Sequence, residues 1–322
     1  MAQTTTGTTN FDKTLTDLIQ MRMEPELRPS LPHLLDGNYR PAKFVKGTNN
    51  TMRFLRMADL AVDINGGTVT PGTQPWLTEG VAPDAEALSF GYEEFSAYQA
   101  GRRVEITDLA ALQSPNDLSA IASEKIALNG AQTADAFVAY TLGQGANVLY
   151  AGDAVSTVTV DNTDVIDATL LRRVRATLKR DNVPTFADGF YRAIIEPGVV
   201  FDIQSDTEVG GWIDASRYAG SMPLLTNELG RFAGIRFVES SNAFIDAGAG
   251  AAGIDVYSTL VFGPEAYAFG DWGTITGHYV APGGHGDELA QVASIGWKGR
   301  FGCIILDEAG PRYVRVESGT GL

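Results

Sequence analysis

The chain has 322 residues, of which 44% are hydrophobic and 20% charged, a composition typical of a folded protein and not of a disordered one. Acidic residues outnumber basic ones by 39 to 24, which gives a net charge of −15 and argues against tight nucleic-acid binding. The single cysteine, Cys303, excludes an internal disulfide and a cysteine-rich zinc site, and its apolar neighbours favour a buried side chain. No secretory signal or membrane-length apolar run is present, so we expect a soluble protein made in a cytoplasm.

Residues 1–50 are predicted to form an N-terminal arm. After a Thr-rich start, apolar spacing predicts a short helix over Phe11–Met23, and four prolines between residues 25 and 41 then interrupt regular structure. A segment with so little core of its own needs a surface to lie on. That surface is either the rest of the chain or a neighbouring subunit.

The next segment is predicted to be extended. Thr51–Met57 is a candidate strand, Asn65-Gly66-Gly67 is typical of a hairpin turn, and apolar residues alternate over Leu88–Tyr92 and again over Val104–Ile106. Ala100-Gly101 indicates a bend or bulge between the last two runs. Together they predict a long hairpin, which needs a partner surface because isolated hairpins are marginally stable in water.

Two helices are predicted in the middle of the chain. The first spans residues 114–143, with Ser114 as N-cap, Pro115 in the first turn and Gly143 at the end. The second spans Asp164–Arg180, with an apolar stripe of Leu170 or Leu171, Val174 and Leu178, and it carries basic residues along its C-terminal half. These charges indicate either a solvated face that suits the helix dipole or a contact with an acidic neighbour, with polyanion binding as a third interpretation.

From residue 191 onward, short strands alternate with short helices, so the predicted fold class is α+β. Helices are predicted at Pro197–Ser205 and Pro264–Phe269. Strands are predicted at Tyr191–Glu196, Gly234–Glu239, Val256–Phe262, Ala293–Trp297, Gly302–Leu306 and Tyr313–Val316.

Motifs for catalysis or cofactor binding are weak. Gly248, Gly250 and Gly253 have dinucleotide-loop spacing, but a strand and not a helix is predicted to follow them, so a surface loop is the better interpretation. His278, His285 and Asp287 share a Gly-rich loop and form the best hypothetical enzyme or metal site, although a solvated loop explains them more simply. We therefore predict no catalytic, metal or cofactor site. An arm and a hairpin that cannot bury their own apolar surface instead favour a subunit of an assembly.

The order of these elements resembles that of tailed-phage major capsid proteins of the Hong Kong 97-like fold, and more closely their N-four-like subgroup. The motifs that carry the resemblance lie between residues 50 and 306 and include Trp76-Leu77-Thr78-Glu79-Gly80, Val104-Glu105-Ile106-Thr107-Asp108-Leu109, Leu178-Lys179-Arg180-Asp181-Asn182, Arg217-Tyr218-Ala219-Gly220, Gly230-Arg231-Phe232-Ala233-Gly234 and Ser294-Ile295-Gly296-Trp297-Lys298.

The resemblance implies a division of the chain into an N-terminal arm (1–50), an extended hairpin loop (51–113), the spine helix of a peripheral domain (114–145), an axial domain (146–285) and returning peripheral-domain strands (286–322). It implies a major capsid protein, not an enzyme, whose copies form pentamers and hexamers of an icosahedral or prolate virion shell. The subunit-interface candidates are Asn65, Trp76, Glu79, Phe90, Tyr92, Arg102, Arg103, Arg172, Arg175, Arg217, Tyr218 and Arg231.

Further partners follow from the same resemblance. The arm is short for a fused scaffolding domain, which implies a separate scaffolding protein, and a portal and a decoration protein are the other expected partners. The acidic wall is expected to enclose double-stranded DNA without binding it specifically, because many phosphate contacts would trap the packaged genome. The alternative is an encapsulin-type nanocompartment shell that encloses a cargo enzyme.

Overall fold

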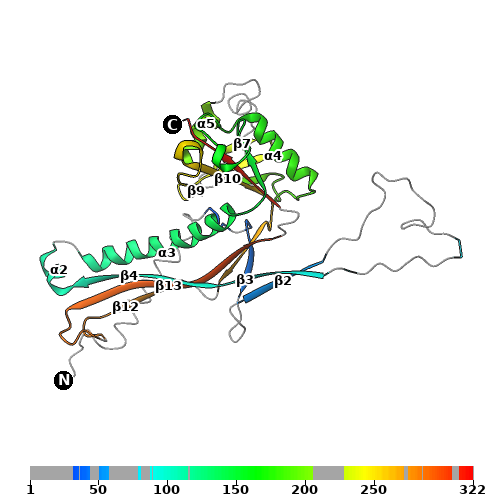
Figure 1. Ribbon diagram of the computed structural model, residues 1–322. Coiled ribbons are helices and arrows are strands. Elements are labelled where there is room, and N and C mark those ends of the chain that lie inside the picture. The colour runs from blue at the N-terminus through cyan, green and yellow to red at the C-terminus, as the bar shows by residue number, and fades with distance from the viewer. Residues whose placement is uncertain are drawn as a thin grey trace. The chain divides into compact units, whose positions relative to one another are not determined.

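The computed structural model describes residues 32–35, 37–43, 51–57, 79–80, 88, 90–114, 117–205, 228–271, 275–284, 286–306 and 312–321 (Figure 1). The helix predicted over Phe11–Met23 and the turn predicted at Asn65–Gly67 lie outside these ranges. Contacts divide the chain into two units, one comprising Asn49–Ser96 and the other the preceding and following residues. Each unit is described by itself below.

The smaller unit contains a two-stranded antiparallel ladder of β2 (Thr51–Met57) and β3 (Phe90–Ser96). Thr51 pairs with Ser96 and Met57 with Phe90, so the register is continuous over seven residue pairs. Phe54 and Phe95 stack with ring centroids 5.9 Å apart. The predicted strand over Thr51–Met57 is confirmed, and the strand predicted from the alternation over Leu88–Tyr92 begins at Phe90, so Leu88 lies outside it.

The larger unit contains a first sheet organised around one long strand, β13 (Val292–Ile305). Along one edge β13 pairs with β4 (Tyr98–Thr107), and along the other it pairs first with β12 (Thr276–Val280) and then with β11 (Tyr267–Asp271). The short strand β1 (Arg40–Lys43) adds to β11 in parallel. Buried and exposed residues alternate through Trp297–Phe301, which joins the two strands predicted at 293–297 and 302–306 into one.

A long helix, α3 (Leu118–Gly143), runs along this sheet beside β4 and β13 (Figure 1). Its buried side contributes Ile126, Ala127 and Ala134 to a core that includes Trp297 and Phe301. The Trp297 indole N–H donates to Asn129 Oδ1 at 3.0 Å, which satisfies the buried polar end of the ring. No helix among the described residues has the length and apolar character needed to cross a membrane.

The larger unit also contains a second sheet with the strand order β5-β14-β10-β6-β8-β7, to which β9 (Ile245–Asp246) adds at β10. The strands are β5 (Val148–Tyr150), β6 (Tyr191–Ile195), β7 (Glu228–Phe232), β8 (Ile235–Glu239), β10 (Val256–Phe262) and β14 (Tyr313–Ser318). Its core includes buried residues of α4 (Ala168–Arg180) and α5 (Pro197–Ser205), with Leu171, Val174 and Leu178 as the predicted apolar stripe of α4. The α+β class is confirmed.

The long helix begins later than predicted, because a different residue caps it. The Asp117 carboxylate accepts the backbone N–H groups of Ser119 and Ala120 at 3.0 and 3.2 Å, so Asp117 is the N-cap. Ser114, the predicted cap, instead ends a short helix, α2 (Asp108–Gln113), and Pro115 lies outside the described residues. Similarly, α4 begins after Asp167 and not at Asp164.

Two further predictions are corrected by strand pairing. Residues 98–107 do not extend the β2–β3 hairpin but pair with β13, without a register shift at Ala100-Gly101. Gly101 is required there for close approach, since a Cβ would lie 2.7 Å from the Trp297 carbonyl oxygen. The helix predicted at Pro264–Phe269 is wrong: Pro264 and Glu265 form a turn, and β11 follows because Tyr267 is buried in the core.

Candidate functional site

One face of the β2–β3 ladder is apolar and exposed. Leu55 pairs with Tyr92, and the side chains of Leu55, Tyr92 and Phe90 are 71%, 64% and 57% exposed. Cross-strand partners project from the same side of an antiparallel ladder, and alternate residues share that side. These three residues therefore form one surface, here called the hairpin face. Single exposed apolar residues are ordinary, but three adjacent ones are typical of a contact surface.

Charged residues extend the hairpin face on one side. Arg53 pairs with Glu94 across the ladder, with Nε and Oε2 2.6 Å apart, and its guanidinium lies 5.0 Å from the centre of the Tyr92 ring. The Glu94 hydrogen bond raises the pKa of Arg53. The ion pair therefore holds the Arg53 side chain against the Tyr92 ring, while Leu55 and Phe90 remain exposed beside it.

A second exposed surface lies along β4 and α2. Arg102 and Arg103 are exposed on β4, where Arg103 Nη2 contacts Glu105 Oε1 at 2.8 Å. Leu109 and Leu112, on the α2 helix that follows, are 60% and 82% exposed. Because β4 pairs only with β13 among the described strands, its other edge also offers backbone groups for pairing.

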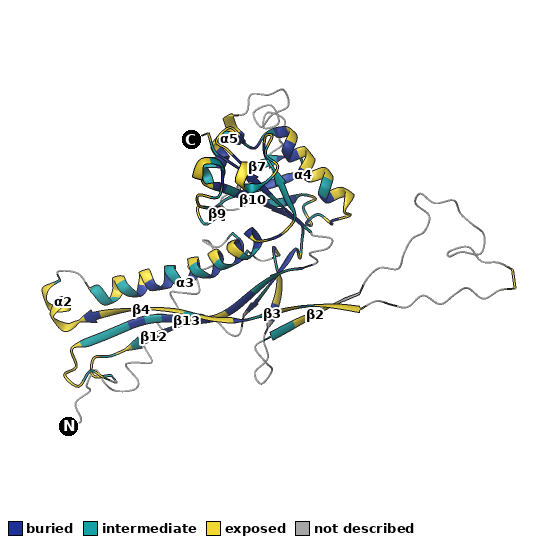
Figure 2. Ribbon diagram, viewed as in Figure 1, coloured by how far each residue is buried: buried dark blue, intermediate teal, exposed yellow. Residues whose placement is uncertain are grey.

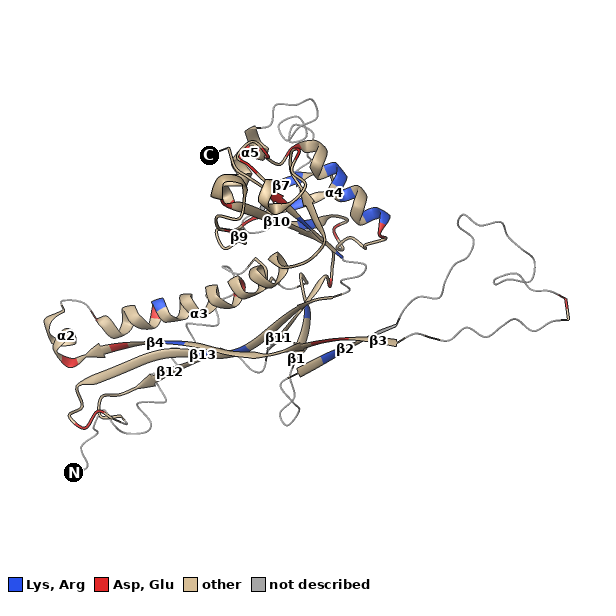
Figure 3. Ribbon diagram, in the orientation of Figure 1, with Lys and Arg blue, Asp and Glu red and all other residues tan. Residues whose placement is uncertain are grey.

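The outer face of α4 is basic. Its buried side packs on the second sheet, and Arg172, Arg173, Arg175, Lys179 and Arg180 are exposed on the other side (Figures 2 and 3). Arg231 on β7 is half-buried, with its guanidinium 5.1 Å from the centre of the Phe190 ring. The structure thus places three predicted interface residues, Arg172, Arg175 and Arg231, in one part of the larger unit.

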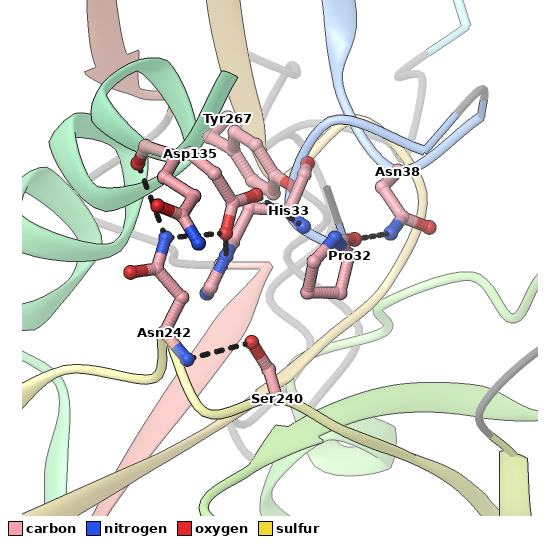
Figure 4. Close-up of polar contacts among 8 residues, drawn as sticks. Pro32, His33, Asn38, Asp135, Ser240, Asn242 and Tyr267 are labelled. Carbon is pink, nitrogen blue, oxygen red and sulfur yellow. Dashed lines mark hydrogen bonds and ion pairs between the residues drawn. The ribbon is translucent and has the colours of Figure 1, made fainter. Parts of the chain in front are cut away.

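A buried polar cluster holds the N-terminal segment against the larger unit (Figure 4). The Asp135 carboxylate on α3 accepts the backbone N–H of His33 at 3.0 Å and lies 2.9 Å from His33 Nδ1. Asn242 donates its side-chain N–H to the same carboxylate at 3.0 Å, and the Tyr267 hydroxyl donates to the His33 carbonyl. Burial raises the pKa of Tyr267 well above its usual value, so this hydroxyl remains a donor.

This cluster is structural, since it connects four parts of the chain. His33 comes from the N-terminal segment, Asp135 from α3, Asn242 from the loop after β8 and Tyr267 from the start of β11. His33 and Asp135 are both fully buried, which leaves no access for a substrate. Nothing in the sequence indicated this pairing, because 102 residues separate His33 from Asp135.

Local hydrogen bonds account for Asp287 and His278, the two residues of the hypothetical enzyme site that the structure describes. Asp287 accepts the backbone N–H groups of Gly283, Gln291 and Val292 at 2.9–3.0 Å, and these bonds, that of Gly283 foremost, lower the pKa of Asp287. His278 lies on β12 with its Nε2 3.0 Å from the Thr276 hydroxyl, and His285 lies outside the described residues. Among the residues that the structure describes, no three potential ligands gather as a metal site requires.

Of the remaining predicted interface residues, some are exposed and the others lie outside the described residues. Glu79 is exposed in a turn, and Phe90, Tyr92, Arg102 and Arg103 are exposed on strands. Asn65, Trp76, Arg217 and Tyr218 lie outside the described residues. The sequence interpretation missed Leu55, Leu109 and Leu112, and the adjacent apolar pair Phe54-Leu55 gave no alternation that would indicate which side chain is exposed.

Comparison with known proteins gives a match at the level of structure. No protein-family model matches the chain, and no curated protein is significantly similar to it in sequence. The capsid of Ralstonia phage GP4 is similar in structure, with a TM-score of 0.65 and 15% identity over 88% of this chain and 87% of that one. The capsid of cyanophage P-SCSP1u matches with a TM-score of 0.62 and 16% identity, covering 88% of this chain and 86% of that one.

A third example is the cyanophage Pam1 capsid, with a TM-score of 0.60 and 13% identity over 86% of both chains. Identities this low establish the fold and not the function. The chain therefore has the fold of tailed-phage capsid proteins, as the resemblance to the Hong Kong 97-like fold predicted.

Proposed function

We propose that this chain is the major capsid protein of a tailed double-stranded DNA phage, and that its copies assemble into the icosahedral or prolate shell of the head. The observation that supports this most is a fold shared with phage capsid proteins over nearly the whole chain and not over a single domain. Its role is then mechanical, not catalytic: to form a closed wall and contain the genome in the virion.

The finer assignments belong to the same proposal. The motifs between residues 50 and 306 support the N-four-like subgroup. We propose the division into arm (1–50), extended loop (51–113), spine helix (114–145), axial domain (146–285) and returning strands (286–322). The copies would assemble in the host bacterial cytoplasm as pentamers and hexamers around a separate scaffolding protein, with portal and decoration proteins as further partners.

The hairpin face supplies the contact chemistry for this role. Leu55, Phe90 and Tyr92 are exposed in the single chain, and covering them with an adjacent copy would remove apolar area from water. Burying one such side chain contributes about 1.5–3 kcal/mol, so several copies of the contact give cohesion without one large interface. The net charge of −15 suits a wall that encloses DNA without specific binding.

The direct test is to express the chain with and without its scaffolding protein and to examine the product by electron microscopy and light scattering. Capsomers or shells are the expected result. A strictly monomeric product under both conditions would contradict the proposal. Shells that enclose a host enzyme, encoded beside the chain and without portal or terminase genes nearby, would favour the encapsulin-type compartment.

A further inference from the structure

The described residues that precede β2 reach both sheets of the larger unit. These residues, 32–35 and 37–43, are here called the strap. Between described elements the chain passes three times between the second sheet and the layer of α3 and the first sheet, from α3 to β5, from β10 to β11 and from β13 to β14. Connections of this kind permit one packed body to rotate against another, because a few backbone dihedral angles absorb the motion. Noncovalent contacts at the junction therefore decide how the two sheets are oriented.

Strand pairing and aromatic contacts hold the strap on the first sheet. The strap strand β1 runs parallel to β11 over four residue pairs. The Tyr39 ring stacks on the Tyr267 ring with centroids 6.4 Å apart, and it meets the Phe269 ring edge-on at 5.9 Å. The Tyr267 hydroxyl also donates to the carbonyl of His33, at the other end of the strap. Both ends of the strap thus contact β11.

The second sheet holds the strap through Asn38, which is only 2% exposed. Arg192 on β6 donates from Nη1 to Asn38 Oδ1, and its guanidinium lies 4.2 Å from the centre of the Phe186 ring. The Asn38 side-chain N–H donates to the Pro32 carbonyl at 2.9 Å, and its backbone N–H donates to the Leu35 carbonyl at 3.0 Å (Figure 4). Asn38 therefore both closes the strap into a compact loop and ties that loop to the second sheet.

A series of aromatic contacts joins these two attachments across the junction. Phe186, beside Arg192, packs against Phe262, the last residue of β10, with ring centroids 6.3 Å apart. Phe262 in turn meets Tyr267, the first residue of β11, at 5.6 Å. The contacts that leave the strap at Asn38 thus return to it at the next residue, Tyr39. Rotation of one sheet against the other has to break this closed series at some point.

Leu34 adds an apolar contact from the middle of the strap. It packs against the core cluster of the first sheet and α3, which contains Trp297, and against the junction cluster, which contains Tyr267 and Leu260. Withdrawal of the strap would remove contacts from both clusters and leave unfilled space between them, which is unfavourable. The docked strap is therefore the more stable state of the single chain.

We propose that the strap is a releasable lock: while docked it fixes the second sheet relative to the first, and when withdrawn it leaves two folded sheets that pivot about their connections. Its attachments are noncovalent, and the segments on either side of it are the arm and the β2–β3 ladder, which begins eight positions after Lys43. Both segments are proposed to contact adjacent copies, so those contacts act on the lock through the backbone. In this respect the inference rests on the proposed function.

The distance between two spin labels, measured by pulsed electron paramagnetic resonance, tests the lock in the single chain. In a Cys303→Ala background, Lys298→Cys on β13 and Gln204→Cys on α5 give two exposed labelling sites, one in each sheet layer. The otherwise unchanged protein is expected to show one narrow distance distribution. Adding Asn38→Ala and Tyr39→Ala removes both attachments, and the distribution is then expected to broaden or to split into two maxima.

The control is Val174→Ala with Ile295→Ala, which removes one buried side chain from the own core of each sheet. Ile295 pairs with Val104 and Tyr279, whereas the strap lies beside the part of β11 that pairs with residues 301–305. This variant is destabilised but should keep the narrow distribution. A strap variant that is folded by circular dichroism and as narrow as the control would overturn the lock. If the double strap variant does not fold, Asn38→Ala and Tyr39→Ala singly decide the question in the same way.

Shell geometry provides the second test, because subunit shape sets the curvature of a closed assembly. Folded strap variants should give shells of mixed diameter, and the control should give shells as uniform as those of the wild type. Uniform shells from a variant with a broadened distance distribution would overturn the link between the strap and assembly. Wild-type protein that never assembles would contradict the proposed function, while the distance measurement would still decide whether the strap fixes the two sheets.

Discussion

His33 and Asp135 lie 102 positions apart in the chain and form two hydrogen bonds with each other, and neither side chain is exposed. The Asp135 carboxylate accepts a backbone and a side-chain N–H from His33 and a third N–H from Asn242. One carboxylate on α3 therefore orients both the N-terminal segment and the loop after β8.

Replacing Asp135 with alanine should destabilise the larger unit strongly. The substitution leaves the backbone and side-chain N–H groups of His33 buried without their acceptor, and breaking a buried pair in this way costs about 3–5 kcal/mol. Urea unfolding measures the loss. Glu124→Ala, on the exposed side of α3, should change stability by less than about 0.5 kcal/mol. A double-mutant cycle with His33→Ala should show a coupling of about 0.5–3 kcal/mol, and additive effects would contradict the pairing.

Polar substitutions on the hairpin face should impair assembly but not folding. Leu55→Ser with Tyr92→Ser removes apolar groups that are already exposed in the single chain, so the urea midpoint of the monomer should change little. Shell yield by electron microscopy should fall sharply. The matched pair Leu55→Met with Tyr92→Phe keeps the apolar area and should assemble. If the serine variant assembles as well as this pair, the hairpin face is not a subunit contact.

A methyl group at Gly101 should destabilise the pairing of β4 with β13. The new Cβ would lie 2.7 Å from the Trp297 carbonyl oxygen, which is backbone and cannot rotate away, so a cost of about 1–3 kcal/mol is expected for Gly101→Ala. Gly91, on β3, has open space around it, and Gly91→Ala should alter stability by no more than about 1 kcal/mol. Hydrogen exchange of the β4 amides distinguishes the two, and equal protection in both variants would refute the close approach.

Cys303 should react very slowly with thiol reagents in the native protein. Burial raises its pKa to about 12, so at pH 8 it carries roughly three orders of magnitude less thiolate than a free cysteine with a pKa of about 8.5. Unfolding in urea should restore the ordinary rate. Rapid modification of the folded protein by an aromatic disulfide reagent would show that the thiol is accessible.

The loop between β12 and β13 should loosen in acid because of Asp287. Its pKa is lower in the folded chain than the usual value of about 3.9, so the carboxylate stabilises the loop above that value. This stability is lost as the pH falls through the lower folded-state pKa. The protection of the Gly283, Gln291 and Val292 amides, measured as exchange relative to the intrinsic rate at each pH, should therefore fall below about pH 4 in the wild type. Asp287→Asn should show low protection of these amides already at pH 7, and that protection should change little with pH.

The sequence predicted local structure well where a short-range pattern determined it. Pro197–Ser205 and Val256–Phe262 were predicted with the bounds that the structure shows, and the apolar stripe of α4 was correctly identified. Helix starts were less accurate, because Ser114, Asp117, Asp164 and Asp167 are all suitable caps and only the folded chain selects among them.

Long-range pairing could not be predicted in the same way. The alternation at Val104 and Ile106 correctly predicted a strand but did not show that its partner is β13, nearly 200 residues later. The helix predicted at Pro264–Phe269 failed because burial of Tyr267 outweighed the local preference for a helix after proline. The interface candidates within the described residues are exposed except for the half-buried Arg231, but exposure alone does not identify a partner.

The unbroken course of β13 has a mechanical consequence. Ten consecutive pairs join it to β4, so pulling the two strands apart along their length would load many hydrogen bonds at once. Tension entering near Val292 would reach Ile305 through covalent backbone alone, without crossing a loop that could stretch. Under internal pressure, such a strand would transmit tension along its length with very little extension.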